Sequence, residues 1–296
     1  MKRSAALLIG IGLLLLGPTT AQAAEPHTVC SAVRPLPPGV YGNVTAERGC
    51  RLNETHVVEG WLWVYAEGGD GGFPEVDGTR IGGDLVVEGD GDVTGAHIGG
   101  SAFFLGGYAS SIRESDVGGV IWTAGGFGAM YVVGNTVGGD VILDGAGSDE
   151  VVASDNLVGG DLLVSRFSGN FSIDRNRVAR NFRVTDATAY NYGPSSVSEN
   201  HVGGHFEVAR AEIAIFPETP AGLEPSIMVR GNDVGGHAGV FESAIRFYGG
   251  GAARSGLAGI QLRENQVAGA LLCSNNSDLV AQGNAAHPAL GQCRER

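Results

Sequence analysis

Apolar and polar residues alternate in short runs along most of the chain. A period of two residues predicts β-strands that bury one face, because successive side chains point to opposite sides of a strand. One set of alternating pairs follows a Gly-Gly step, a second set precedes an asparagine, and no later stretch shows the period of a useful helix. Examples are Leu85/Val87, Val141/Leu143, Leu162/Val164, Phe182/Val184 and Phe206/Val208 after Gly-Gly, and Phe171/Ile173, Ile227/Val229 and Ile260/Leu262 before Asn.

The unit Asn-x-Val-Gly-Gly, with small variations, recurs through the second half of the chain at spacings of 21, 20, 24, 32 and 33 residues. Earlier copies keep the apolar-Gly-Gly part without the asparagine, for example at Ile81 and Ile98. A unit of about 20 residues cannot bury its apolar face alone, but a stack of such units can. The pattern therefore predicts an all-β fold, a right-handed parallel β-helix of about ten coils. The six asparagines are Asn135, Asn156, Asn176, Asn200, Asn232 and Asn265.

The asparagines and glycines then have a structural interpretation. The same position in consecutive coils stacks on itself, so the asparagines should form a buried hydrogen-bonded ladder. The glycines should supply positive φ at the corner and add no side chain to a crowded stack. The alternative is a phosphate-binding loop, which needs a helix after the glycines, whereas strands follow them here.

The chain begins with features typical of a secretory signal peptide. Met1-Lys2-Arg3 precedes the apolar run AALLIGIGLLLLG, and AQA at 21–23 fits a cleavage site. No later run is long enough to span a membrane. Removal of residues 1–23 changes the net charge from −13 to −15 and takes away the only lysine. We expect an exported protein, secreted or periplasmic, whose acidic surface excludes nucleic acid as a partner.

Four cysteines in an exported chain predict two disulfides. Three pairings are open, and sequence position favours Cys30–Cys50 and Cys273–Cys293. The expected organisation is a capping segment at 24–57, the β-helix at 58–272 and a disulfide-closed cap at 273–296. The absence of a C-x-x-C motif argues against metal or redox chemistry at these cysteines.

The segment NQVAGALLCSNN…GNAAHPALGQC at 265–293 resembles the ending of a family of small secreted bacterial proteins. These proteins carry N-x-V-G-G-x-L-x-C repeats and a final Gly-Gln-Cys, and their opening is similar to PPGVYGNVTAERGCRLNETHVVEGWLWV, which ends here at Val64. The chain departs from them in its longer coils and in His287-Pro288, where Gly-Gly is usual. The resemblance implies the fold and export, and it supplies no catalytic residue because members are generally of unassigned function.

Alignment of the coils on Gly-Gly predicts one column of outward-facing residues that is apolar over six coils. Exposed, this stripe would be a binding or assembly surface for a second copy, another surface protein or a glycan. Alternatively, residues 24–57 or a long loop cover it, or the alignment slips by one and exchanges core and surface. The stripe residues are Trp63, Val86, Phe103, Trp122, Ile142 and Leu163, and the polar Arg183 and Glu207 continue the column.

Three successive coils carry insertions, at 186–196, 209–226 and 241–259. Because they fall at one place in the repeat, they should emerge side by side, and clustered insertions on a solenoid often form a binding face. Alternatively, the insertions have no function and accumulated by chance, since surface insertions cost little stability. The candidate binding residues in these loops are Tyr190, Tyr192, Phe216, Arg246, Phe247, Tyr248 and Arg254.

The rival to a structural or binding role is a polysaccharide lyase or glycoside hydrolase on the same fold. Hydrolysis needs two carboxylates about 5–10 Å apart. The candidates form no column of aspartates, so we favour a non-catalytic role and expect no cofactor. Stacked His205 and His237 could share a transition metal, and Asp140 and Asp161 a calcium ion, but turn residues are the preferred interpretation. The carboxylate candidates are Asp186, Glu207, Asp233 and Glu242, with Arg183 as the cation.

Overall fold

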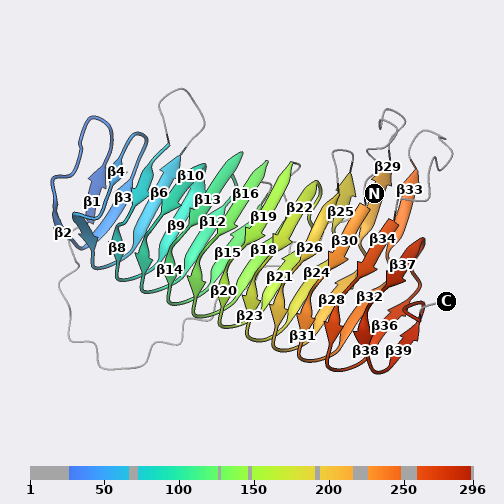
Figure 1. The fold of residues 1–296 in the computed structure, drawn as a ribbon. Coiled ribbons are helices and arrows are strands. Elements are labelled where there is room, and N and C mark those ends of the chain that lie inside the picture. The colour runs from blue at the N-terminus through green and yellow to red at the C-terminus, as the bar shows by residue number, and fades with distance from the viewer. Residues whose placement is uncertain are drawn as a thin grey trace, which may run out of the picture.

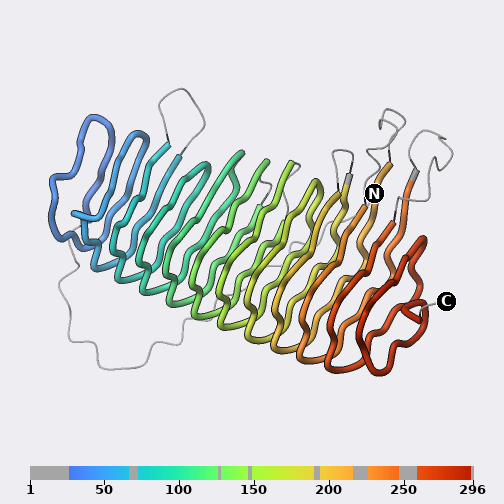
Figure 2. The backbone as a smooth tube through the Cα atoms, viewed as in Figure 1, coloured from blue at the N-terminus to red at the C-terminus, as the bar shows by residue number. Residues whose placement is uncertain are grey.

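The computed structural model describes residues 27–66, 73–125, 128–145, 149–190, 194–215, 226–247 and 259–294, without the side chains of Tyr190 and Phe247. Within these ranges every regular element is a β-strand, and the strands wind about eleven turns of a parallel β-solenoid. The predicted all-β solenoid is confirmed. Figure 2 shows the coils stacked along one axis from the N-terminal to the C-terminal end. In the described part of the chain no helix is long and apolar enough to cross a bilayer.

Most coils contribute one strand to each of three long parallel sheets, which we call sheets A, B and C in their order along a coil. Sheet A has 13 strands and takes the residues that follow Gly-Gly. Its strands are β1 (His27–Cys30), β3 (Asn43–Ala46), β6 (Leu62–Ala66), β9 (Leu85–Gly89), β12 (Ala102–Leu105), β15 (Ile121–Ala124), β18 (Val141–Asp144), β21 (Leu162–Ser165), β24 (Phe182–Thr185), β28 (Phe206–Ala209), β32 (Ala238–Phe241), β36 (Leu271–Ser274) and β39 (Ala289–Gly291).

Sheet B has 11 strands and takes the residues that precede the asparagine. Its strands are β4 (Arg51–Leu52), β7 (Glu75–Asp77), β10 (Gly91–Thr94), β13 (Ala109–Arg113), β16 (Ala129–Val133), β19 (Glu150–Ser154), β22 (Asn170–Asp174), β26 (Ser195–Ser198), β30 (Ser226–Arg230), β34 (Gly259–Arg263) and β37 (Leu279–Gln282).

Sheet C has 12 short strands, most of them only two residues long, between the asparagine and Gly-Gly. Its strands are β2 (Gly39–Tyr41), β5 (His56–Val58), β8 (Arg80–Ile81), β11 (His97–Ile98), β14 (Asp116–Val117), β17 (Thr136–Val137), β20 (Leu157–Val158), β23 (Arg177–Val178), β27 (His201–Val202), β31 (Asp233–Val234), β35 (Gln266–Val267) and β38 (Ala285–Ala286).

Alternate residues of every sheet point inward and form one continuous core. In β9 the inward Leu85 and Val87 are fully buried, and the valine of each Asn-x-Val-Gly-Gly unit is equally hidden, as at Val137. Burial of each such side chain contributes roughly 1.5–3 kcal/mol relative to its exposure to water. The residues that the alternating pattern assigns to the core are therefore the buried ones. The alignment of the coils is not shifted by one residue, which would have exchanged core and surface.

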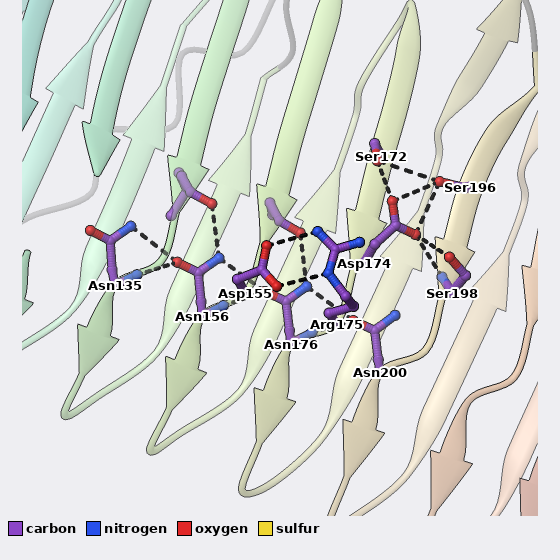
Figure 3. A network of polar contacts seen from close by, with 12 residues as sticks. Asn135, Asp155, Asn156, Ser172, Asp174, Arg175, Asn176, Ser196, Ser198 and Asn200 are labelled. Carbon is purple, nitrogen blue, oxygen red and sulfur yellow. Dashed lines mark hydrogen bonds and ion pairs between the residues drawn. The ribbon is translucent and has the colours of Figure 1, made fainter. Parts of the chain in front are cut away.

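The six predicted asparagines form a buried ladder between sheets B and C, and Figure 3 shows the part from Asn135 to Asn200. Asn156 Nδ2 donates to Asn176 Oδ1 at 2.9 Å and to the Val132 carbonyl at 2.8 Å. Asn156 Oδ1 accepts from the backbone N–H and the Nδ2 of Asn135, both at 3.0 Å. All four hydrogen-bonding positions of the side chain are thus used, and the pattern repeats up to Asn265, whose Nδ2 bonds to Asn284 Oδ1 at 2.9 Å.

The predicted positive φ at Gly-Gly is wrong. Gly138 and Gly139 have no positive φ, and the left-handed conformation lies instead at the residue directly before the ladder position. Gly134, Asp155 and Arg175 are examples, with φ between 56° and 70°. The second expected role of the glycines holds, since a Cβ on Gly138 would lie 2.4 Å from the Gly118 carbonyl oxygen. Gly-Gly is favoured at this corner by the close approach of backbones in neighbouring coils, and alanine or arginine replaces it in a few coils, as at Ala179 and Arg180.

Both favoured disulfides are present. Cys30–Cys50 and Cys273–Cys293 join Cα atoms 5.4 and 5.1 Å apart near the two ends of the solenoid. Sheets A to C continue through both end segments, from β1 to β39. Residues 27–57 therefore pair with the following coils at the edges of these sheets.

Candidate functional site

The predicted stripe residues occupy one column on the outer face of sheet A. Trp63 pairs with Val86, Phe103 lies between Val86 and Trp122, and the register continues through Ile142 to Leu163. Arg183 and Glu207 follow in the next two coils, as expected. Because parallel in-register strands place equivalent residues about 4.8 Å apart, the six apolar side chains extend for about 24 Å.

The stripe is accessible to solvent. The Trp63 side chain is 41% exposed, and the other five are half-buried. The Phe103 and Trp122 rings meet edge to face, with centroids 6.0 Å apart, and Trp61 and Trp63 meet similarly at 6.5 Å. Residues 27–57 do not lie across this face, because β1 and β3 extend sheet A at its edge.

Three further apolar side chains, which the Gly-Gly column does not include, widen the stripe. Trp61, Tyr65 and Leu105 are 36 to 37% exposed. Tyr65 and Leu105 stand two residues after a stripe residue, so the period of two places them on the same face. That signal was present in the sequence, but the alignment followed a single column.

The three insertions emerge side by side, as expected. Their first residues form a short parallel sheet, sheet D, of β25 (Thr188–Tyr190), β29 (Glu212–Ile215) and β33 (Ala244–Phe247), visible at the upper right of Figure 1. Arg246 of β33 pairs with Glu212 of β29 at 2.9 Å. The candidate residues Tyr192, Phe216, Tyr248 and Arg254 lie outside the described residues, as do the side chains of Tyr190 and Phe247.

The residues directly after Gly-Gly form a second hydrogen-bonded column, which we call the turn column. Asp140 Oδ1 accepts the backbone N–H of Asp161 at 2.8 Å, and Asn181 Oδ1 accepts that of His205 at 3.0 Å. His205 and His237 continue this role. Their rings stack with an interplanar angle of 2°, and each Nδ1 accepts a backbone N–H of the next coil. Among the described residues no cluster of three His, Cys, Asp or Glu side chains could hold a metal ion.

Three of the four carboxylates considered for hydrolysis contact an arginine or a histidine one coil away. Asp186 forms two hydrogen bonds with Arg210, at 2.7 and 2.8 Å, and these bonds hold the pKa of its carboxyl below the usual value. Glu207 is 3.7 Å from Arg183 on the stripe column, and Asp233 is 2.9 Å from His201 on sheet C. Glu242 stands at a left-handed corner position, with φ 53°.

A cluster that the sequence did not reveal surrounds Asp174 on sheet B (Figure 3). Its buried carboxylate accepts hydrogen bonds from the hydroxyls of Ser172, Ser196 and Ser198 and from the Ser198 backbone N–H at 2.9 Å. The serines come from β22 and β26, one coil apart. These hydrogen bonds occupy both oxygens of the carboxylate and link two neighbouring coils.

No protein-family model, no curated protein and no solved structure matches the chain.

Proposed function

We propose that this protein is an exported, non-catalytic structural solenoid of the bacterial cell exterior that assembles with a second copy of itself through the stripe. One observation carries the proposal. Six outward residues of sheet A, from Trp63 to Leu163, are apolar, in register and accessible to solvent.

The composition of the stripe favours a protein partner over a glycan. Sugar-binding sites combine aromatic platforms with polar groups that fix the hydroxyls. The six stripe residues offer no polar group apart from the indole N–H of Trp63 and Trp122, and the Phe103 and Trp122 rings are inclined at 87° to each other. Such a surface suits the apolar side chains of another protein.

The stripe is also complementary to itself. In a two-fold symmetric pair the same patch meets its copy in the opposite direction. With full overlap Phe103 faces the partner's Trp122, and Val86 faces the partner's Ile142, because these residues are symmetric about the centre of the column. The arrangement places four aromatic rings at the centre of the interface, where binding energy is usually concentrated.

Export is supported by features at both ends of the chain. Disulfides persist in oxidising compartments, and two close the ends of the solenoid. The basic start, apolar run and AQA site of residues 1–23 agree with removal of a signal peptide. The likeness to secreted bacterial proteins at 265–293 points the same way.

A triple variant, Trp63→Ser with Phe103→Ser and Trp122→Ser, tests the assembly. Wild-type protein should sediment as a dimer, and the variant should be monomeric, because the largest apolar groups of the interface are lost. Analytical ultracentrifugation over a concentration series measures both.

The matched control replaces Val152, Met228 and Val280 by serine, on the outward column of sheet B. This control should remain dimeric. A wild-type protein that is monomeric at every concentration sinks the proposal, and a glycan-array signal lost only in the stripe variant would reassign the stripe to a glycan.

A further inference from the structure

An open groove runs along sheet C, on a different face from the stripe. Two adjoining hollows, of about 860 and 480 Å³, share Thr136 in their lining. The outward residues of successive sheet C strands form one wall, and glycines after most of these strands leave the floor bare of side chains, as at Gly82 and Gly138. Glu59 and Ala179 stand at the same position in two coils. From Val57 to His201 the groove crosses seven coil steps, about 34 Å at the strand spacing.

The glycines of the floor offer a ligand no free backbone N–H. Gly82 N–H donates to the Val58 carbonyl at 2.7 Å, and Gly138 and Gly159 repeat the bond to Val117 and Val137 at 2.8 Å. Recognition of an extended peptide by strand addition needs unpaired backbone donors and acceptors at a sheet edge. Strand addition is therefore disfavoured as the mode of binding in this groove.

The wall combines exposed arginines with acidic and apolar residues, since Glu59, Asp116 and Val57 line the same hollow as Arg80. Arg80 and Arg177 are exposed, and neither makes an ion pair with any other part of the chain that the structure describes. His97 and Asp116 lie between them, bonded to each other at 2.9 Å. Leu157, 52% exposed, adds an apolar contact beside Arg177.

One coil adds a further positive charge near the groove, because its sequence departs from the Gly-Gly repeat. The segment RNRVARNFR at 175–183 has Arg180 where the neighbouring coils have Gly160 and Gly204. Arg180 is exposed, and no ion pair within the described ranges neutralises it. The coil thus presents Arg177 and Arg180 three residues apart around the corner beside the groove. In a chain whose net charge is −15 without residues 1–23, these are unneutralised cations on an acidic molecule.

We propose that the groove of sheet C binds an acidic polysaccharide, with carboxylates at Arg80 and Arg177, sugar hydroxyls on His97, Asp116 and Thr136, and Arg180 adding positive charge outside the lining. Guanidinium groups form strong charge-assisted hydrogen bonds with carboxylates. Arg80 and Arg177 are five coil steps apart, about 24 Å, so carboxylates are required only at intervals. A densely charged polyanion is disfavoured, because the acidic body of the protein repels it.

Hyaluronan, which has a carboxylate on every second sugar, is the probe, and isothermal titration calorimetry at low ionic strength is the measurement. Wild-type protein should bind hyaluronan and should not bind dextran, which is neutral. The double variant Arg177→Gln/Arg180→Gly should lose affinity by about tenfold or more, since charged hydrogen bonds are removed. It should fold normally, because glutamine occupies the sheet C column at Gln266 and glycine is the usual residue at the second position.

Arg34→Gln/Arg294→Gln is the control, since it removes two exposed arginines at the solenoid ends and changes the net charge equally. It should bind hyaluronan as the wild type does, and so should the stripe triple variant, which separates this site from the proposed assembly. No binding of hyaluronan, equal binding of dextran, or equal loss in the two arginine variants would overturn the proposal.

Discussion

At the residue scale, the carboxamide of asparagine meets a geometric demand that few other side chains can meet. Each ladder position must accept two hydrogen bonds from the preceding coil and donate one along the stack and one to a sheet B carbonyl. Where Ser115 replaces asparagine, its hydroxyl accepts the Ala96 N–H at 3.1 Å and donates to the Arg113 carbonyl at 2.8 Å, so fewer bonds are made. The ladder is therefore most complete in the C-terminal half.

Asn176→Ala should destabilise the protein by about 3 kcal/mol or more, because it leaves buried groups of Asn156 and the Ala153 carbonyl without partners. Urea unfolding followed by circular dichroism measures the loss. Gln266→Ala, at an exposed position beside the ladder, is the control and should change stability by less than about 0.5 kcal/mol. Equal midpoints for the two variants would contradict a stabilising ladder.

At the element scale, two-residue strands are sufficient in sheet C because a strand at each neighbouring coil supports them. The corners between strands then fix the path of the chain. Residues in the left-handed conformation directly precede the ladder positions. At Gly-Gly the backbones of neighbouring coils approach closely without side chains between them. A left-handed charged residue such as Glu199, with φ 57°, costs about 1–2 kcal/mol relative to glycine. The stack of neighbouring coils outweighs that cost.

Gly138→Val should destabilise the solenoid by about 1–3 kcal/mol, because its side chain is forced against the Gly118 carbonyl. Gly138→Ala should cost less, since alanine is the natural residue at the corresponding Ala179 and Ala268. Thermal unfolding of both variants gives the comparison. Valine and alanine variants of equal stability would mean that the corner has room to spare.

At the scale of the whole molecule, ion pairs between successive coils connect the surface along the solenoid axis. Arg166 pairs with Asp144, Arg175 with Asp155 and Arg210 with Asp186. In each pair the hydrogen bonds from arginine are the main cause of a lowered carboxyl pKa. A carboxyl whose pKa is depressed in the folded state stabilises the fold above its unfolded pKa, and this contribution is lost as the pH falls through the folded value.

The double variant Arg166→Gln/Arg210→Gln should therefore have a lower Tm than the wild type at pH 7, and the difference should shrink below about pH 4 as the partner aspartates become protonated. Differential scanning calorimetry from pH 7 to pH 2 measures the two curves. The effect should be small, since these pairs are largely exposed. A Tm difference independent of pH would show that the arginines act by packing instead of charge.

The sequence predicted the features that repeat in every coil. The inward phase of Leu85 and Val87, the asparagine ladder and the register from Trp63 to Leu163 follow from stacking like positions. The pairing of Cys30 with Cys50 was favoured by their positions in the sequence. The position of the left-handed residues did not follow, because glycine, aspartate and arginine share that column at Gly134, Asp155 and Arg175. A column that contains several residue types cannot be recognised as left-handed from its composition.

The sequence by itself determined the solenoid, since its short repeat leaves an apolar face that only a neighbouring coil can bury. Tertiary structure alone decided which surfaces the stack creates. The Ser196–Asp174 contact spans 22 residues, and the groove of sheet C joins side chains of eight coils into one lining. Such features depend on which side chains remain exposed and close together once backbone hydrogen bonds stack coils of unequal length.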